Sequence, residues 1–334
     1  MKKIAAIATV LLIAVLAGFS IWQRTGSRAS YSGALEAITL GGLVADSNLL
    51  FFTAEDQRFF SANGINFTFK TYSTGLDTID DLLKGNLDIA GAAEYPIVAK
   101  AFAKSDIRII ASMNKAYNEF IIGFTERGIR HISDLKGKKI GLPRGTILEF
   151  FLGRFLTLNG MSVRDVTLIN VPPGHAADAI ASGSIHALVT WEPYASRIQK
   201  EFANRTVSWP VQSSQAVHGV LICRNDWLRT HPDVVRRFLS ALARAEEYIV
   251  QHPDEAKAIL KKRYRYADAY VEKIWSENRF SLSLDQPLIT ALEDEARWMI
   301  GNRLVTEKTV PDFLDYIYPD GLKAVKPDAV SIIR

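Results

Sequence analysis

Two stretches of the chain share one pattern of apolar and polar positions. The first, Ile79–Pro96, reads IDDLLKGNLDIAGAAEYP, and the second, Ala177–Tyr194, reads ADAIASGSIHALVTWEPY. Aligned with an offset of 98 positions, each predicts an amphipathic helix that ends at a glycine, a short apolar strand, and a glutamate close to a proline. The apolar runs Leu87–Ala92 and Ile185–Thr190 are typical of strands buried on both faces of a parallel sheet.

The glutamates of the two copies, Glu94 and Glu192, follow closely on these strands. Ligands of open α/β sheets bind beyond the carboxyl ends of the strands. We therefore expect one glutamate from each half of the molecule at a shared cleft, which is typical of a two-lobed binding protein.

Strands alternate with helices along most of the chain. The pattern predicts strands at 35–43, 65–72, 87–92, 107–113, 119–124, 138–142, 165–171, 185–190 and 217–223. Besides the two repeat helices, it predicts helices at 49–61, 96–104, 147–158, 232–251, 253–264, 268–276 and 286–302. This alternation indicates an α/β protein with two doubly wound lobes, parallel sheets and helices on both faces.

The chain is expected to cross between the lobes at Asn114–Glu119 and again at Trp209–His218. Residues 34–116 then form the first part of lobe 1 and residues 117–215 form lobe 2. Residues 216–334 form the second part of lobe 1, with a helical C-terminal extension.

The first 22 residues are expected to direct export. Lys2 and Lys3 precede the uncharged run Ile4–Trp22, and Ala17 is small enough for signal peptidase cleavage. The run is also long enough to span a bilayer as an uncleaved anchor. Either way we expect a periplasmic or cell-surface protein, with residues 23–33 as a linker. No cysteine lies near this leader, which excludes lipid attachment there.

The amino-acid composition and the absence of certain motifs exclude several classes of function. The single cysteine, Cys223, excludes an intramolecular disulfide and thiolate ligation of zinc or an iron–sulfur cluster, and no cofactor is expected. Without Lys2 and Lys3 the basic and acidic residues nearly balance, so a nucleic-acid partner is not expected. No G-x-S-x-G, H-E-x-x-H or glycine-rich phosphate motif points to catalysis.

Four segments resemble the nitrate, sulfonate and taurine class of ABC-transporter substrate-binding proteins. They read KGNLDIAGAAEYP, DLKGKKIGLPRGT, ALVTWEPY and DWLRTHPDVVRRFLSAL, and the similarity extends over roughly residues 34–300. The resemblance implies a type II periplasmic-binding fold with two connecting segments and a closing cleft. It also implies a monomer that takes up a small-molecule ligand and delivers it to a membrane permease and ATPase. Many members of this class carry a lipid-attachment cysteine, which this leader lacks.

The expected ligand-binding residues lie on loops at the carboxyl ends of strands in both lobes. They are Asp46, Ser47, Asn48, Ser73, Thr74, Gly75, Glu94, Tyr95, Asn114, Arg144, Gly145, Thr146, Thr190, Trp191, Glu192 and His218.

Each of these has a structural alternative. Arg144–Gly145–Thr146 precedes a helix, so its N–H groups and the arginine suit an anionic group, or it is a plain helix cap. Glu94 and Glu192 suit an ammonium, amidine or ring N–H, or each pairs with a helix N-terminus or a lysine. The aromatic and histidine side chains can equally serve packing.

Acidic and basic groups across one cleft suit a zwitterion or a nitrogen heterocycle better than a simple inorganic anion. Two other functions are weighed against transport. One is a sensor with the same binding module on an uncleaved anchor, and the other is a small-metabolite enzyme that shares the fold.

Overall fold

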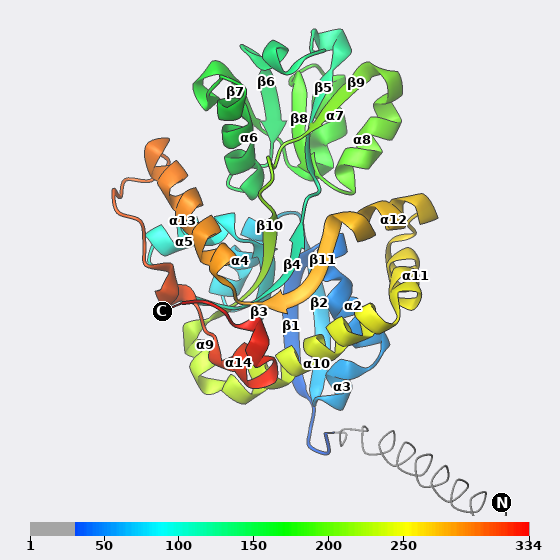
Figure 1. The fold of residues 1–334 in the computed structure, drawn as a ribbon, viewed down its shortest axis with the longest axis vertical. Coiled ribbons are helices and arrows are strands. Elements are labelled where there is room, and N and C mark those ends of the chain that lie inside the picture. Colours follow the sequence, from blue (N-terminus) through cyan, green and yellow to red (C-terminus); the bar gives the residue numbers. More distant parts are fainter. Residues whose placement is uncertain (1–30, 334) are drawn as a thin grey trace, which may run out of the picture.

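The computed structural model describes residues 31–333, which form two lobes, each built on a mixed β-sheet (Figure 1). The sheet of lobe 1 contains β1 (Glu36–Leu43), β2 (Ile65–Tyr72), β3 (Ile89–Ala93), β4 (Ile107–Ala116), β10 (Val217–Arg224) and β11 (Asn278–Ser283). The sheet of lobe 2 contains β5 (Glu119–Phe124), β6 (Lys139–Leu142), β7 (Thr167–Asn170), β8 (Ala187–Trp191) and β9 (Thr206–Pro210). The predicted leader and most of the linker lie outside the described residues.

Both sheets have the same strand order. Lobe 1 reads β2–β1–β3–β10–β4–β11 and lobe 2 reads β7–β6–β8–β5–β9. The repeated strands β3 and β8 therefore occupy equivalent positions. In each sheet the first three strands are parallel, and the fourth, β10 or β5, is antiparallel to its repeated neighbour. The sequence repeat thus corresponds to two copies of one topology.

The antiparallel strands correct the expectation of purely parallel sheets. The chain leaves lobe 1 after β4 and enters lobe 2 as β5, then leaves after β9 and re-enters lobe 1 as β10. Each sheet therefore receives its fourth strand directly from the other lobe. A strand that arrives from the far side of the cleft runs opposite to strands that end at the cleft.

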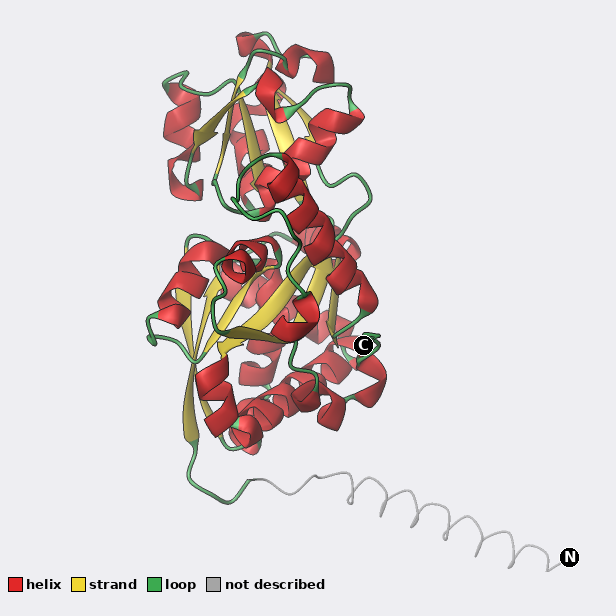
Figure 2. Cartoon of the chain, turned by 90° about the vertical axis from the view of Figure 1, so that its left-hand side faces the viewer, coloured by secondary structure: helices red, strands yellow, loops and turns green. Residues whose placement is uncertain are grey.

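Helices flank both sheets (Figure 2). In lobe 1 they are α2 (Leu49–Asp56), α3 (Phe59–Ala62), α4 (Gly75–Leu83) and α5 (Tyr95–Phe102), and in lobe 2 they are α6 (Ile147–Leu158), α7 (Ala176–Ala181) and α8 (Tyr194–Phe202). The C-terminal part adds α9 (Asn225–Thr230), α10 (Pro232–Gln251), α11 (Pro253–Tyr264), α12 (Asp268–Glu277), α13 (Gln286–Gly301) and α14 (Asp320–Val325). Within residues 31–333, none of the helices has the length and apolar character required to cross a membrane.

Some predicted elements differ from the structure. The helix expected at 49–61 is two helices, α2 and α3, because Arg58 between them adopts a left-handed conformation with a φ of 57°. The strands β9 and β11 and the helix α14 were not predicted. Their segments are short and contain too few apolar residues to show a clear periodicity. The strands β9 and β11 are therefore recognised only from their pairing with a neighbouring strand.

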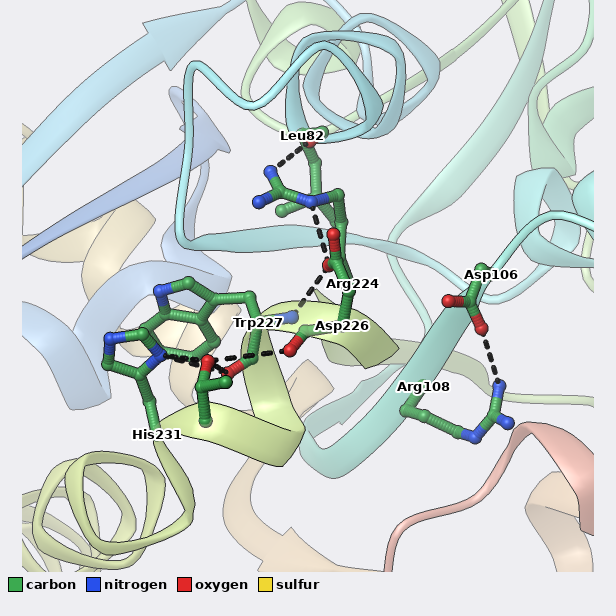
Figure 3. Close-up of polar contacts among 8 residues, drawn as sticks. Leu82, Asp106, Arg108, Arg224, Asp226, Trp227 and His231 are labelled. Carbon is green, nitrogen blue, oxygen red and sulfur yellow. Dashed lines mark hydrogen bonds and ion pairs between the residues drawn. The ribbon is translucent and has the colours of Figure 1, made fainter.

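A polar cluster lies where β10 ends and α9 begins, at the end of lobe 1 that is opposite lobe 2 in Figure 1, and Figure 3 shows its contacts. Arg224 donates from Nε to Oδ1 of Asp226 at 3.1 Å and from Nη1 to the carbonyl oxygen of Leu82 at 3.1 Å. Asp226 also accepts the N–H of Trp227, whose ring stacks on His231 with the centroids 4.8 Å apart. These contacts attach the end of α4 to α9 and belong to the structural framework of lobe 1.

The helix α13 connects the two lobes. It packs on α5 of lobe 1, and its Trp298 contacts α6 of lobe 2. The ring centroid of Trp298 lies 5.8 Å from that of Phe150 and 6.2 Å from that of Tyr95. A Cβ atom added at Gly153 would lie 2.5 Å from the Trp298 ring, so only glycine admits this approach. The lobes are therefore in direct apolar contact on this side of the cleft.

Candidate functional site

A cavity of about 100 Å³ lies between the carboxyl ends of the parallel strands of both sheets. Seven of the expected ligand-binding residues line it: Ser47, Asn48, Gly75, Asn114, Thr146, Trp191 and Glu192. The walls also contain residues that were not predicted, among them Met113, Asn118, Glu119, Val217 and Gly219. Both lobes and both crossing segments thus contribute to one site.

The other expected residues lie near the cavity without lining it. They are Asp46, Ser73, Thr74, Glu94, Tyr95, Arg144, Gly145, Thr190 and His218. Direct ligand contact by any of the sixteen residues stays a prediction.

Several of these residues have structural partners. Thr74 forms a capping box with Asp77 at the start of α4. Arg144 makes an ion pair with Glu149 of α6 at 2.7 Å, and the N–H of Gly145 donates to the same carboxylate at 2.9 Å. The loop before α6 is therefore held by an internal carboxylate, which favours the structural alternative for the Arg144 side chain.

Tyr95 and His218 face other surroundings. Tyr95 is buried in the contact between the lobes, where its ring stacks on Phe150. His218 lines a second groove, behind the crossing segments, together with Lys115 and Arg154. Burial lowers the pKa of His218 to about 4, with the charge of Lys115 as a further cause, so the ring is neutral at physiological pH.

The N-termini of α4 and α6 face each other across the cavity. Gly75 begins α4, while Thr146 and Ile147 begin α6, and all three residues line the cavity. A Cβ atom at Gly145 would lie 3.3 Å from the Leu76 side chain, which shows how closely the two helix starts approach. The positive ends of both helix dipoles therefore point toward the cavity.

Glu192 is buried and paired. Its carboxylate accepts from Nζ of Lys273 in α12 at 2.5 Å, and from the Oγ and N–H groups of Ser196 in α8 at 2.8 and 3.0 Å. Lys273 also lies 4.9 Å from the centroid of the Phe120 ring. Glu192 thus joins the end of β8 in lobe 2 to α12 in the C-terminal part of the chain. This contact agrees with the structural alternative in which the glutamate pairs with a lysine.

Asp46 lies among tyrosines of the C-terminal segment. Burial raises the pKa of Asp46 to about 7, an effect that the hydroxyls of Tyr266 and Tyr270 oppose. Burial likewise raises the pKa of both tyrosines above their usual range. The hydroxyl group of Tyr264 donates to the carbonyl oxygen of Ala45 at 2.9 Å. This group of side chains attaches the start of α2 to α11 and α12.

Three buried carboxyl groups lie close together, and we call them the carboxyl trio: Glu94, Glu119 and Glu295. Of the three, Glu119 lines the cavity. Oε2 of Glu94 accepts the N–H of His218 at 3.0 Å, and burial raises the pKa of Glu94 to about 8. Burial raises the pKa of Glu119 and Glu295 well above the usual range, and the charge of Glu94 adds to both. No grouping of His, Cys, Asp and Glu within residues 31–333 is arranged to hold a metal ion.

Sequence reasoning missed the residues contributed by the C-terminal helices and, apart from Asn114, those of the first crossing. Glu119 had a signal, because it is an acidic residue inside the predicted crossing segment 114–119. Lys273 and Glu295 had none, because helical periodicity identifies a buried face without naming its partner.

Comparison with known proteins identifies the family of the chain. Residues 47–256 match the family model described as NMT1/THI5 like. A Brucella abortus protein whose name assigns it no ligand is 26% identical over 227 residues, which cover 66% of this chain and 68% of that protein. The taurine-binding periplasmic protein of Escherichia coli is 23% identical over 200 residues, covering 60% of this chain and 62% of the relative.

Solved structures share the fold. The alkanesulfonate-binding protein SsuA from Xanthomonas axonopodis pv. citri, bound to MOPS, superposes with a TM-score of 0.75 at 19% identity, over 86% of this chain and all of that one. The desulfurization enzyme DSZB superposes with a TM-score of 0.63 at 18% identity, over 88% of this chain and 99% of that one. The two lobes therefore have the periplasmic-binding-protein fold, and the chain belongs to the NMT1/THI5-like family.

Proposed function

We propose that this protein is the extracytoplasmic solute-binding component of an ABC importer, which encloses a small polar solute between its lobes and delivers it to a membrane permease. The observation that carries the proposal is the cavity between the two sets of strand ends, with walls from both lobes and both crossing segments. Relatives named for taurine and alkanesulfonate binding support the same function.

The arrangement suits capture by lobe closure. The start of α4 belongs to lobe 1 and the start of α6 to lobe 2, so a solute that accepts N–H bonds from both holds the lobes together. The asparagines Asn48, Asn114 and Asn118 add both donors and acceptors to the walls. A closed complex is the form that a permease would recognise.

Stabilisation by ligand tests this function. A solute present at about 100 times its dissociation constant should raise the free energy of unfolding by about 2.7 kcal/mol, which a thermal-shift screen of sulfonates, amino acids and pyrimidines will detect. Native mass spectrometry of freshly purified protein should show the bound solute directly. Ala93→Trp, which places an indole at the cavity wall, should abolish both signals while leaving the protein folded.

The same experiment separates a binding protein from an enzyme, because the desulfurization enzyme shares the fold. A binding protein returns its solute with unchanged mass after prolonged incubation. Conversion of the best hit into a product would favour the enzyme. Absence of any bound or stabilising solute would refute solute binding altogether.

We further propose that the protein acts outside the cytoplasm. The N-terminal residue of the protein isolated from its cells distinguishes the two versions of this proposal. A start after the uncharged run indicates a released binding protein, and a start at residue 1 indicates one that is anchored by its leader.

A further inference from the structure

We propose that Glu119 is the acceptor for an amino or other N–H-bearing nitrogen of the solute, so that the protein selects amine-bearing solutes over sulfonates that lack an amine. This inference rests on the solute-binding function proposed above and concerns the same cavity. Glu119 is not among the residues that the sequence singled out.

The backbone of Glu119 is held rigidly between the two crossing segments. Its N–H donates to Oε1 of Gln212 at 3.0 Å, and its carbonyl oxygen accepts the N–H of Val211 at 3.0 Å. The amide nitrogen of Gln212 in turn donates to the carbonyl oxygens of Ala116 and Gln215 at 2.8 and 3.1 Å. The side chain of Glu119 therefore starts from a position that is fixed relative to both lobes.

One oxygen of the Glu119 carboxyl group is buried at the cavity wall and unpartnered within residues 31–333. The residue lines the cavity and is 4% exposed, and its Oε2 has no hydrogen-bond partner within the described part of the chain. A buried acceptor without a partner has lost its hydrogen bonds to water without replacement, which is unfavourable. A solute that donates an N–H to this oxygen replaces a lost hydrogen bond when it binds.

The charges around the cavity favour a nitrogen donor. Glu119 and Glu192 line it, and within residues 31–333 no Lys, Arg or His does so. The charge of Glu192 is already compensated by Lys273. Among residues 31–333, Glu94 and Glu295 are the acidic neighbours of Glu119, and neither can compensate a negative charge on it. A sulfonate without an amine would meet this carboxyl group uncompensated, whereas an ammonium would neutralise it.

Binding of a cation should also release a proton. Burial raises the pKa of each carboxyl group of the trio above the usual range of glutamate, so these groups keep their protons to a higher pH. Asp294 beside Glu295 contributes a further negative charge. On the β10 side the neighbouring groups are the neutral ring of His218 and, beyond it, Lys115 and Asp285. A cation at Glu119 favours the ionised carboxylate, so affinity for an amine should rise with pH.

Matched pairs of solutes test the inference on the full-length protein. Taurine is compared with isethionate, which carries a hydroxyl in place of the amine, and with ethanolamine, which carries a hydroxyl in place of the sulfonate. Calorimetry should show at least about tenfold tighter binding of the amine member of the pair that the cavity accommodates, the range of one hydrogen bond to a charged group.

Two variants assign the preference to a residue. Glu119→Gln should remove the preference and the proton release. Glu295→Gln belongs to the same trio without lining the cavity and should preserve the preference. If Glu119→Gln does not fold, the solute pairs on the unmodified protein still decide the question.

The possible results distinguish the proposed role of Glu119 from the proposed transport function. Equal binding of the amine and hydroxyl members, or binding only of sulfonates without an amine, overturns the role of Glu119 and leaves solute transport standing. A preference that survives Glu119→Gln likewise overturns it. If no compound of any class binds and none is found in the purified protein, the proposed function fails as well.

Discussion

Replacing Glu94 by glutamine is expected to raise the free energy of unfolding, relative to that of the unmodified protein, by about 4 kcal/mol more at pH 8 than at pH 4.5. Glu94 is fully buried, and burial raises its pKa from an ordinary value of 4.5 to about 8. The folded state therefore holds a proton that the unfolded chain has lost. The stability that protonated Glu94 contributes is complete below pH 4.5 and is lost as the pH rises through about 8.

Glutamine avoids this loss, because it is neutral at every pH and its side-chain oxygen can still accept the N–H of His218. The free energy of unfolding in urea, measured between pH 4.5 and 8.5, should fall more steeply for the unmodified protein than for the variant. Glu247→Gln, at an exposed position of α10, should reproduce the unmodified profile. Parallel profiles for Glu94→Gln and the unmodified protein would show that Glu94 is not buried in its protonated form.

Trp298→Ala is expected to weaken binding of the best solute by about 30-fold or more, because the truncation removes an aromatic contact between the lobes that is worth at least about 2 kcal/mol. Trp298 extends from α13 onto Phe150 and Gly153 of α6. Without this contact the closed form is less populated, and the apparent affinity falls in the same proportion. Small-angle scattering should record a larger radius of gyration for the solute-free variant.

The matched control is Trp227→Ala. Trp227 stacks on His231 at the end of lobe 1 that faces away from the cleft, so its loss should lower stability without changing lobe closure (Figure 3). An unchanged radius and affinity in Trp298→Ala would mean that closure does not depend on α13. An equal effect of both tryptophan variants would indicate general destabilisation.

The sequence was most informative where local pattern determines structure. The repeat of helix, glycine, apolar strand and glutamate predicted the equivalence of β3 and β8, and the fold and family expected from the chain are confirmed. The strands β2 and β5 and the helices α6, α10 and α11 have the predicted bounds. In these segments apolar periodicity and terminal Gly, Pro or Asn residues agree with the tertiary environment.

The sequence was least informative about contacts between distant segments. Glu94 and Glu192 were expected at a shared cleft, one from each half, but only Glu192 lines the cavity. The carboxyl group of Glu94 accepts the N–H of His218, in a strand that follows lobe 2, and its contact with a ligand stays a prediction. Lys273, Glu295 and Trp298 lie on helices whose polar and apolar faces are visible in the sequence. Which lobe each of them meets depends on how the C-terminal segment returns across both lobes, and no local pattern encodes that path.

In each sheet the fourth strand, β10 or β5, follows directly on a strand of the other lobe, and this order has a consequence for biosynthesis. All five strands of the lobe 2 sheet lie within residues 119–210, whereas the lobe 1 sheet needs β10 between β3 and β4. A nascent or refolding chain can therefore complete lobe 2 first, as an autonomous insert. Until Val217–Arg224 is inserted, β3 and β4 present unpaired edges to other chains, so lobe 1 is the half that is more prone to aggregate before the chain is complete.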